Sequence, residues 1–346
     1  MIKYTKNATI VRAQAMYGKR LKQNDYRELA GKKSVSEVAD YLKRNTHYSS
    51  ALSTINPLTI HRGHLESILR RYSFERYISL CDFQQLRKEK FYNYLLVLSE
   101  IREILSVILH INAGNSDEYI SSLPSYLVSK TSFDLIQLAR VRSIKDLMEV
   151  IRHTPYHSVL EKVFLQSEGK ADYLLCEYEL RMYYFKWLID VVNKDLKGKA
   201  RDSLVSQIKM QIDFIDIINA YRMKKYYDLP ADEIDKRSFS FYGRLNSKKY
   251  RQLLETPSEE EFFNALSKTY YGKRMNFEND NFENEIILQR SLLARRSLKF
   301  SEDAAVSIYS FMYHFDIELS NIIKIIEGIR YNRSSEYILG IIVSMG

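Results

Sequence analysis

The chain has 346 residues, a formal net charge of +9, 45% hydrophobic residues and 27% charged residues. This is an ordinary globular composition, and the length is too great for one hydrophobic core. Proline (5) and glycine (11) are too scarce for a β-rich fold, and two cysteines do not indicate a disulfide framework. No hydrophobic run is long enough to span a membrane, and the first residues lack the features of a secretion signal. We therefore expect an all-α, cytoplasmic protein.

Three segments of the sequence share one helix pattern. Each opens with a serine followed three residues later by an acid, as in a capping box, where the hydroxyl accepts a backbone N–H at the helix start. Apolar residues follow at the fourth, fifth and eighth positions after the serine, and each segment ends in Thr-x-Tyr. The serine, acid, threonine and tyrosine are, in chain order, Ser34, Glu37, Thr46 and Tyr48; Ser143, Asp146, Thr154 and Tyr156; and Ser258, Glu261, Thr269 and Tyr271.

A long apolar helix is predicted after each of these segments. The three long helices are expected at residues 91–111, 204–227 and 303–329. Turn-rich loops follow the first two, and the serines recur at intervals of 109 and 115 residues, so both features mark the same boundaries. The predicted helical units are 1–116, 117–229 and 230–346.

The second and third long helices each carry an acid and an asparagine three residues apart, a spacing that places both side chains on one helix face. These pairs are Asp216 with Asn219 and Glu318 with Asn321. We interpret them as a buried hydrogen-bond network that ties each helix to its neighbours, with Arg222 or Arg330 supplying positive charge. Catalysis is less favoured, because a catalytic pair is not expected twice in equivalent positions. The first long helix has Glu100-Ile101-Arg102-Glu103 where the asparagine would be expected.

Sequence motifs for catalysis or phosphate binding are not found: the chain has no P-loop, no GxGxxG and no GxSxG. The pairs His61/His64 and His153/His157 have ligand-like spacing, but we favour solvated or helix-capping histidines, because a zinc site needs further ligands. We predict no catalytic residue, no cofactor and no metal.

The positive charge is dispersed along the chain, with acids near each basic cluster. Nucleic-acid binding is therefore not expected, and a basic all-helical scaffold or RNA-binding protein is the alternative interpretation.

Two segments of the long helices, 215–224 (IDIINAYRMK) and 317–330 (IELSNIIKIIEGIR), carry a family resemblance together with the three Thr-x-Tyr helices. They resemble the central-stalk subunit of rotary V/A-type ATPases, known as the C subunit in archaeal-type and bacterial enzymes and as the d subunit in eukaryotic ones. The resemblance extends over essentially the whole chain. It implies three similar helical domains around a pseudo-threefold axis, which form a funnel without a catalytic site.

The same resemblance implies partners and a role. One face of the funnel would sit on the membrane rotor ring, and its cavity would receive the central axle subunits. The chain would transmit torque between ATP turnover and the transport of H⁺ or Na⁺. It would be cytoplasmic and peripheral to the membrane, as part of the ATPase complex.

Overall fold

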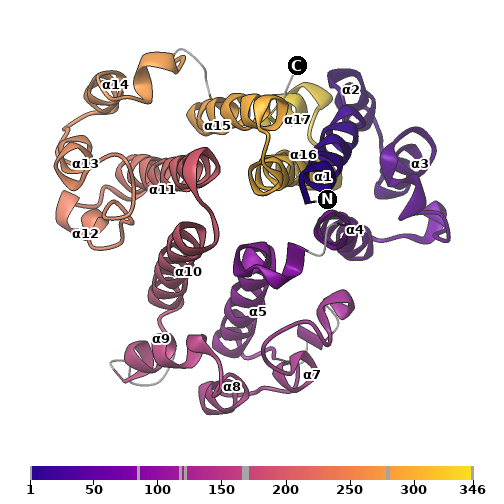
Figure 1. Cartoon of the computed structure of the whole chain (residues 1–346), viewed down its shortest axis with the longest axis horizontal. Coiled ribbons are helices and arrows are strands. Elements are labelled where there is room, and N and C mark those ends of the chain that lie inside the picture. The colour runs from indigo at the N-terminus through magenta and orange to yellow at the C-terminus, as the bar shows by residue number, and fades with distance from the viewer. Residues whose placement is uncertain are drawn as a thin grey trace. The chain divides into compact units, whose positions relative to one another are not determined.

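The computed structural model describes residues 2–83, 86–116, 119–120, 123–165, 171–277 and 281–343. Every regular element in these ranges is a helix, and the helical content of 75% confirms the predicted all-α class (Figure 1). The scarcity of proline and glycine accounts for helices of up to 30 residues. In the described part of the chain, no helix is both long and apolar enough to cross a membrane.

The chain forms two compact units, and each is described here by itself. The first unit combines Met1–Leu86 with Lys197–Gly346, and the second is Arg87–Leu196. The first contains α1 (Ile2–Gly18), α2 (Gln23–Ala30), α3 (Val35–Asn45), η1 (His47–Ser50), η2 (Pro57–Thr59), α4 (Arg62–Asp82), α11 (Gly198–Tyr227), α12 (Ala231–Asp235), α13 (Ser247–Leu254), α14 (Glu259–Ser267), η6 (Gly272–Arg274), α15 (Phe282–Phe300), α16 (Ala304–Arg330) and α17 (Ser335–Ile341). The second contains η4 (Lys90–Asn93), α5 (Tyr94–Ala113), η5 (Ser125–Leu127), α7 (Leu135–Leu138), α8 (Ile144–Val150), α9 (Pro155–Phe164) and α10 (Tyr173–Asp195). The threefold division at residues 116 and 229, and the funnel, stay predictions.

Serine caps set the starts of α3, α8 and α14. The hydroxyl groups of Ser34, Ser143 and Ser258 each accept the backbone N–H three residues later at 3.2 Å. At Ser143 the capping box is complete, because the Asp146 carboxylate accepts the Ser143 N–H at 3.0 Å. With the starts placed in this way, the fourth and eighth positions after each serine are buried: Val38, Leu42, Leu147, Ile151, Phe262 and Leu266.

The Thr-x-Tyr ending turns the chain inward after each capped helix. The threonine hydroxyl donates to the carbonyl oxygen of the residue eight positions after the serine. This carbonyl lies at the end of the helix, where it has no backbone N–H partner within the helix. These bonds join Thr46 to Leu42 (2.6 Å), Thr154 to Ile151 (2.7 Å) and Thr269 to Leu266 (2.7 Å). The tyrosine two residues later is buried in all three segments.

Each long helix packs against a helix of another predicted unit: the first two against the unit that follows in the sequence, and the third against the first unit. Helix α5 packs on α10, α11 packs on α15, and α16 packs on α4. Helix α16 also lies beside α1, so a helix near the end of the sequence completes the core around its first helices (Figure 1).

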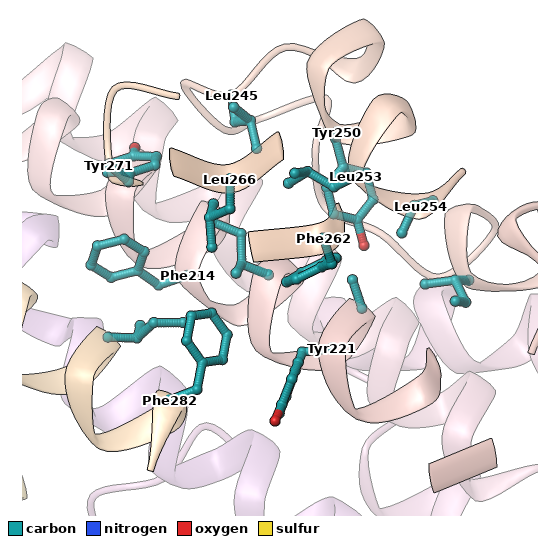
Figure 2. Packing of buried hydrophobic residues seen from close by; sticks show 14 of the residues in the cluster. Phe214, Tyr221, Leu245, Tyr250, Leu253, Leu254, Phe262, Leu266, Tyr271 and Phe282 are labelled. Carbon is teal, nitrogen blue, oxygen red and sulfur yellow. The ribbon is translucent and has the colours of Figure 1, made fainter. Parts of the chain in front are cut away.

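Helix α11 meets α13, α14 and α15 in a cluster rich in aromatic rings (Figure 2). Phe214 packs edge-on against Tyr271, with ring centroids 4.9 Å apart, and Tyr221 lies 4.9 Å from Phe282. Buried aromatic rings remove a large apolar area from water, so this cluster fixes α11 against the helices around it.

Candidate functional site

A buried carboxylate on each of three long helices accepts a hydrogen bond from the tyrosine of a Thr-x-Tyr segment. The carboxylates belong to Glu100 on α5, Asp213 on α11 and Glu318 on α16, which are 3%, 1% and 2% exposed. The donors, in chain order, are Tyr48 to Glu318 (2.9 Å), Tyr156 to Glu100 (2.5 Å) and Tyr271 to Asp213 (2.5 Å). We call these three arrangements the carboxylate–tyrosine links.

Each carboxylate also accepts backbone N–H groups from the turn that precedes a short helix. The donors are Leu21 to Glu318 (2.6 Å), Ser132 to Glu100, and Arg244 and Leu245 to Asp213 (2.9 and 3.0 Å). These turns lead into α2, α7 and α13, the helices that come before the capped ones. One carboxylate therefore fastens a long helix to two points of another segment, and the donors offset the cost of burying it.

The electrostatics of the links favour a structural role over proton transfer. Burial raises the pKa of Glu100 and of Asp213, while the hydrogen bonds from tyrosine and backbone oppose that shift. Burial also raises the pKa of Tyr48, Tyr156 and Tyr271 above the usual value for tyrosine, and the nearby carboxylates raise it further. The tyrosines therefore keep their protons and act as stable donors.

The link at Glu318 has an additional member. His47 stands between Thr46 and Tyr48, where the other two segments have proline and tyrosine. Its Nε2 lies 2.7 Å from Glu318 Oε1, so a protonated His47 forms an ion pair with this carboxylate. At Asp213 the nearby positive charge of Arg244 plays a comparable part, because it lowers the pKa of this carboxylate, which burial raises.

A second acceptor follows each carboxylate after three residues on the same helix. The acceptors and donors are Glu103 with the Tyr119 hydroxyl (2.7 Å), Asp216 with the Phe239 N–H (2.9 Å) and Asn321 with the Val343 N–H (3.0 Å). The Asn321 amide also donates to the Val343 carbonyl at 2.8 Å. The polar pair thus occurs in all three long helices, including α5, where the sequence has no asparagine.

The structure aligns the polar residues of α11 and α16 differently from the sequence pattern. By their hydrogen bonds, Asp213 corresponds to Glu318 and Asp216 corresponds to Asn321. The sequence pattern had instead matched Asp216 with Glu318 and Asn219 with Asn321, one helical turn later on α11. Asp216 is buried and its pKa is raised well above the usual value by desolvation. Asn219 is half-buried, and its side chain makes no hydrogen bond with another described residue.

The two predicted arginines lie on the surface, away from the buried acids. Arg222 donates to Glu283 at 2.5 Å, and Arg330 is exposed with its guanidinium carbon 5.5 Å from the Tyr331 ring centroid. Their side chains are long enough to reach solvent, where a charge is well hydrated. The buried carboxylates are therefore compensated by neutral donors, by His47 at Glu318 and by the nearby charge of Arg244 at Asp213.

Sequence reasoning missed Glu100 and Asp213 as members of the links, although a signal for them exists. Each linking carboxylate has an apolar residue three positions before it and four after it, so it falls inside the apolar stripe of its helix. The flanking residues are Val97 and Ile104, Met210 and Ile217, and Phe315 and Ile322. An acid at such a position is predicted to be buried and therefore to need donors from another segment.

The histidine pairs are not brought into a metal site. His61 caps α4 and its Nδ1 accepts the His64 N–H at 3.3 Å. Pro155 begins α9, so His153 precedes the helix that contains His157. Among the described residues, no group of three or more histidine, cysteine, aspartate or glutamate side chains is close enough to hold a metal ion.

Comparison with known proteins gives consistent results. A family model described as ATP synthase (C/AC39) subunit matches residues 9–341. The C subunit of the A-type ATP synthase of Methanosarcina mazei is 27% identical over 72% of this chain and 59% of its own length, and that of Methanosarcina barkeri is 26% identical over the same shares. The corresponding protein of Methanosphaera stadtmanae is 23% identical over 75% of this chain and 65% of its own length. The match thus spans about three-fifths of the first two relatives.

Proposed function

Because the chain belongs to the ATP synthase (C/AC39) subunit family, we propose that it is a non-catalytic central-stalk subunit of a rotary V/A-type ATPase. In this role it links the rotor axle to the membrane rotor ring and transmits torque, so that ATP turnover is coupled to the transport of H⁺ or Na⁺. Its partners are the axle subunits and the ring, and it is cytoplasmic and peripheral to the membrane. The family match over residues 9–341 is the observation that carries this proposal.

The carboxylate–tyrosine links support the mechanical part of the proposal. Segments with many buried contacts and protected hydrogen bonds open least often, and a torque carrier must not open under load. The links fasten α5, α11 and α16, which are 20, 30 and 27 residues long, each at two points of another segment. A force applied to such a helix is passed to the attached segment with little local deformation.

The test is a reconstitution in sealed vesicles with and without this chain. Omitting the chain should leave ATP hydrolysis by the catalytic head intact, while ATP-driven ion uptake falls to the level seen with an uncoupling ionophore. Uptake is followed with a pH-sensitive dye for H⁺ and with radioactive Na⁺ for sodium.

Adding the purified chain back should restore uptake in proportion to the amount bound, which controls for damage to the membrane sector. Undiminished ATP-driven uptake in its absence would contradict the coupling role. ATP hydrolysis by the isolated chain would contradict its non-catalytic character.

A further inference from the structure

A cavity of about 280 Å³ lies among α1, η1, α4 and α16, within the first compact unit. Its wall combines aromatic rings with the three cationic side chains of Lys19, Arg20 and Arg76. Lys19 and Ser49 are exposed residues of this wall, so a ligand can reach the cavity from solvent. The chemistry of the cavity is decided by what the cationic groups contact.

Arg20 and Arg76 are held by aromatic rings and not by acids. The guanidinium carbon of Arg20 lies 4.2 Å from the Tyr17 ring centroid, and that of Arg76 lies 4.7 Å from the Tyr72 ring centroid. Within the described residues neither guanidinium has a carboxylate partner, and the Nε atoms of both lack an acceptor. Nη1 of Arg20 also donates to the Tyr17 carbonyl at 3.3 Å. The remaining N–H groups of a guanidinium held by its face stay available for an anion.

The charges that line the cavity do not balance. Glu318 is its single carboxylate, and both oxygens are already occupied: Oε1 by Tyr48 and His47, and Oε2 by the Leu21 N–H. Three cations against one carboxylate leave two positive charges in excess when the histidines are neutral. A positive field is also felt by His314 on the same wall, whose pKa is lowered to about 3 by burial first and then by Arg20 and other arginines.

We propose that this cavity binds a phosphate group. Phosphate carries about 1.5 to 2 negative charges at neutral pH, which matches the excess, whereas a carboxylate would leave one positive charge uncompensated. The flat edge of a guanidinium donates two parallel hydrogen bonds to phosphate oxygens, and Lys19 adds a mobile charge at the entrance. The aromatic rings of the wall can contact the carbon part of a small phosphomonoester.

The test uses inorganic phosphate as the probe and the full chain, with titration calorimetry at constant ionic strength and chloride as the replaced anion. The wild-type chain should bind phosphate saturably. Arg20→Gln and Arg76→Gln should each raise the dissociation constant about 10-fold or more, because each removes charge-assisted hydrogen bonds. Arg71→Gln is the matched control: Arg71 is exposed on the same helix as Arg76, pairs with Glu75 at 2.8 Å and should leave binding unchanged.

Absence of saturable binding by the wild-type chain would overturn the proposal, as would unchanged binding by both glutamine variants. Circular dichroism in chloride checks that the variants are folded. Where a glutamine variant unfolds, Arg76→Lys keeps the charge but not the planar fork, and binding equal to wild type would again contradict the proposed geometry. The proposal rests on the cavity alone, so its failure leaves the coupling role and its vesicle test untouched.

Discussion

Helices α11 and α16 carry the same arrangement of acceptors with different charges. On each helix the first acceptor binds a tyrosine hydroxyl and backbone N–H groups, and the second, three residues later, binds a backbone N–H. On α11 both acceptors are acids, Asp213 and Asp216, and burial raises the pKa of both. On α16 the second acceptor is the neutral Asn321, and the first, Glu318, has His47 beside it.

The comparison shows that the fold requires acceptors at these positions and that negative charge is optional at the second. A backbone N–H is satisfied equally by a carboxylate or an amide oxygen, so Asp216 and Asn321 can fill equivalent places. The first position is more demanding, because it must serve a hydroxyl and at least one N–H at the same time.

The largest effect is expected from Glu318→Leu, which removes the first acceptor of α16. The Tyr48 hydroxyl, the Leu21 N–H and His47 would lose their partner, and the free energy of unfolding should fall by about 3–5 kcal/mol. Urea unfolding followed by circular dichroism measures the change. Asp316→Leu, at an exposed position of the same helix, should change stability by less than about 0.5 kcal/mol, and equal losses in both variants would argue against the link.

The asparagines of the two helices should respond differently to the same substitution. Asn321→Leu removes both hydrogen bonds to the Val343 backbone and should cost about 1–3 kcal/mol, because these buried groups are left unpaired. Asn219→Leu removes no hydrogen bond to a described residue and should cost less than about 0.5 kcal/mol. Thermal and urea unfolding measure the loss of stability in the two variants. A larger loss for Asn219→Leu than for Asn321→Leu would support the pairing of Asp216 with Asn219 that the sequence suggested.

The position of Asp213 is also enforced by packing, which Gly243→Ala tests. A Cβ atom at residue 243 would overlap Asp213 Oδ1, so either the turn or the carboxylate must move. We expect a loss of about 1–3 kcal/mol. Gly18→Ala, where nothing lies within 4 Å of the added atom, is the control and should be near neutral. A tolerated Gly243→Ala would show that this link is not tightly held.

The smallest effect at acidic pH is expected from Asp216→Asn, which gives α11 the second acceptor of α16. The amide oxygen keeps the bond from the Phe239 N–H, so the fold should be retained. The folded pKa of Asp216 is raised, so its contribution to stability is present below its usual value of 3.8 and is lost as pH rises through the folded pKa. The asparagine variant should therefore gain stability relative to wild type from about pH 4 upward. Urea midpoints at several pH values measure this, and a parallel pH profile for both proteins would contradict the assignment.

The capped helices and their Thr-x-Tyr endings could be predicted from the sequence because they depend on residues within one short segment. Ser143 and Thr154 act on backbone groups three positions away, so their spacing is sufficient information. The partners of the tyrosines could not be predicted in the same way. Tyr48 and Glu318 are 270 positions apart, and only tertiary packing brings them together.

The sequence pattern matched Asp216 and Asn219 with Glu318 and Asn321, whereas the residues in the equivalent role are Asp213 and Asp216, one helical turn earlier. The reason is related. The acid–asparagine spacing is present in both α11 and α16, but it does not report which turn faces the neighbouring segment. The apolar residues around Asp213 carry that information, because burial and not spacing decides which acid needs donors.

The packing of α16 against the first helices has a consequence for synthesis on the ribosome. Leu21, His47 and Tyr48 leave the ribosome long before residue 318 is added, and at usual elongation rates the delay is roughly 15 to 60 seconds. During this interval the amino-terminal helices lack the helix that completes their core and expose apolar surface. We therefore expect the nascent chain to need chaperones that hold this surface, and a chain truncated before α16 to lack the helix that completes the core of its amino-terminal segment.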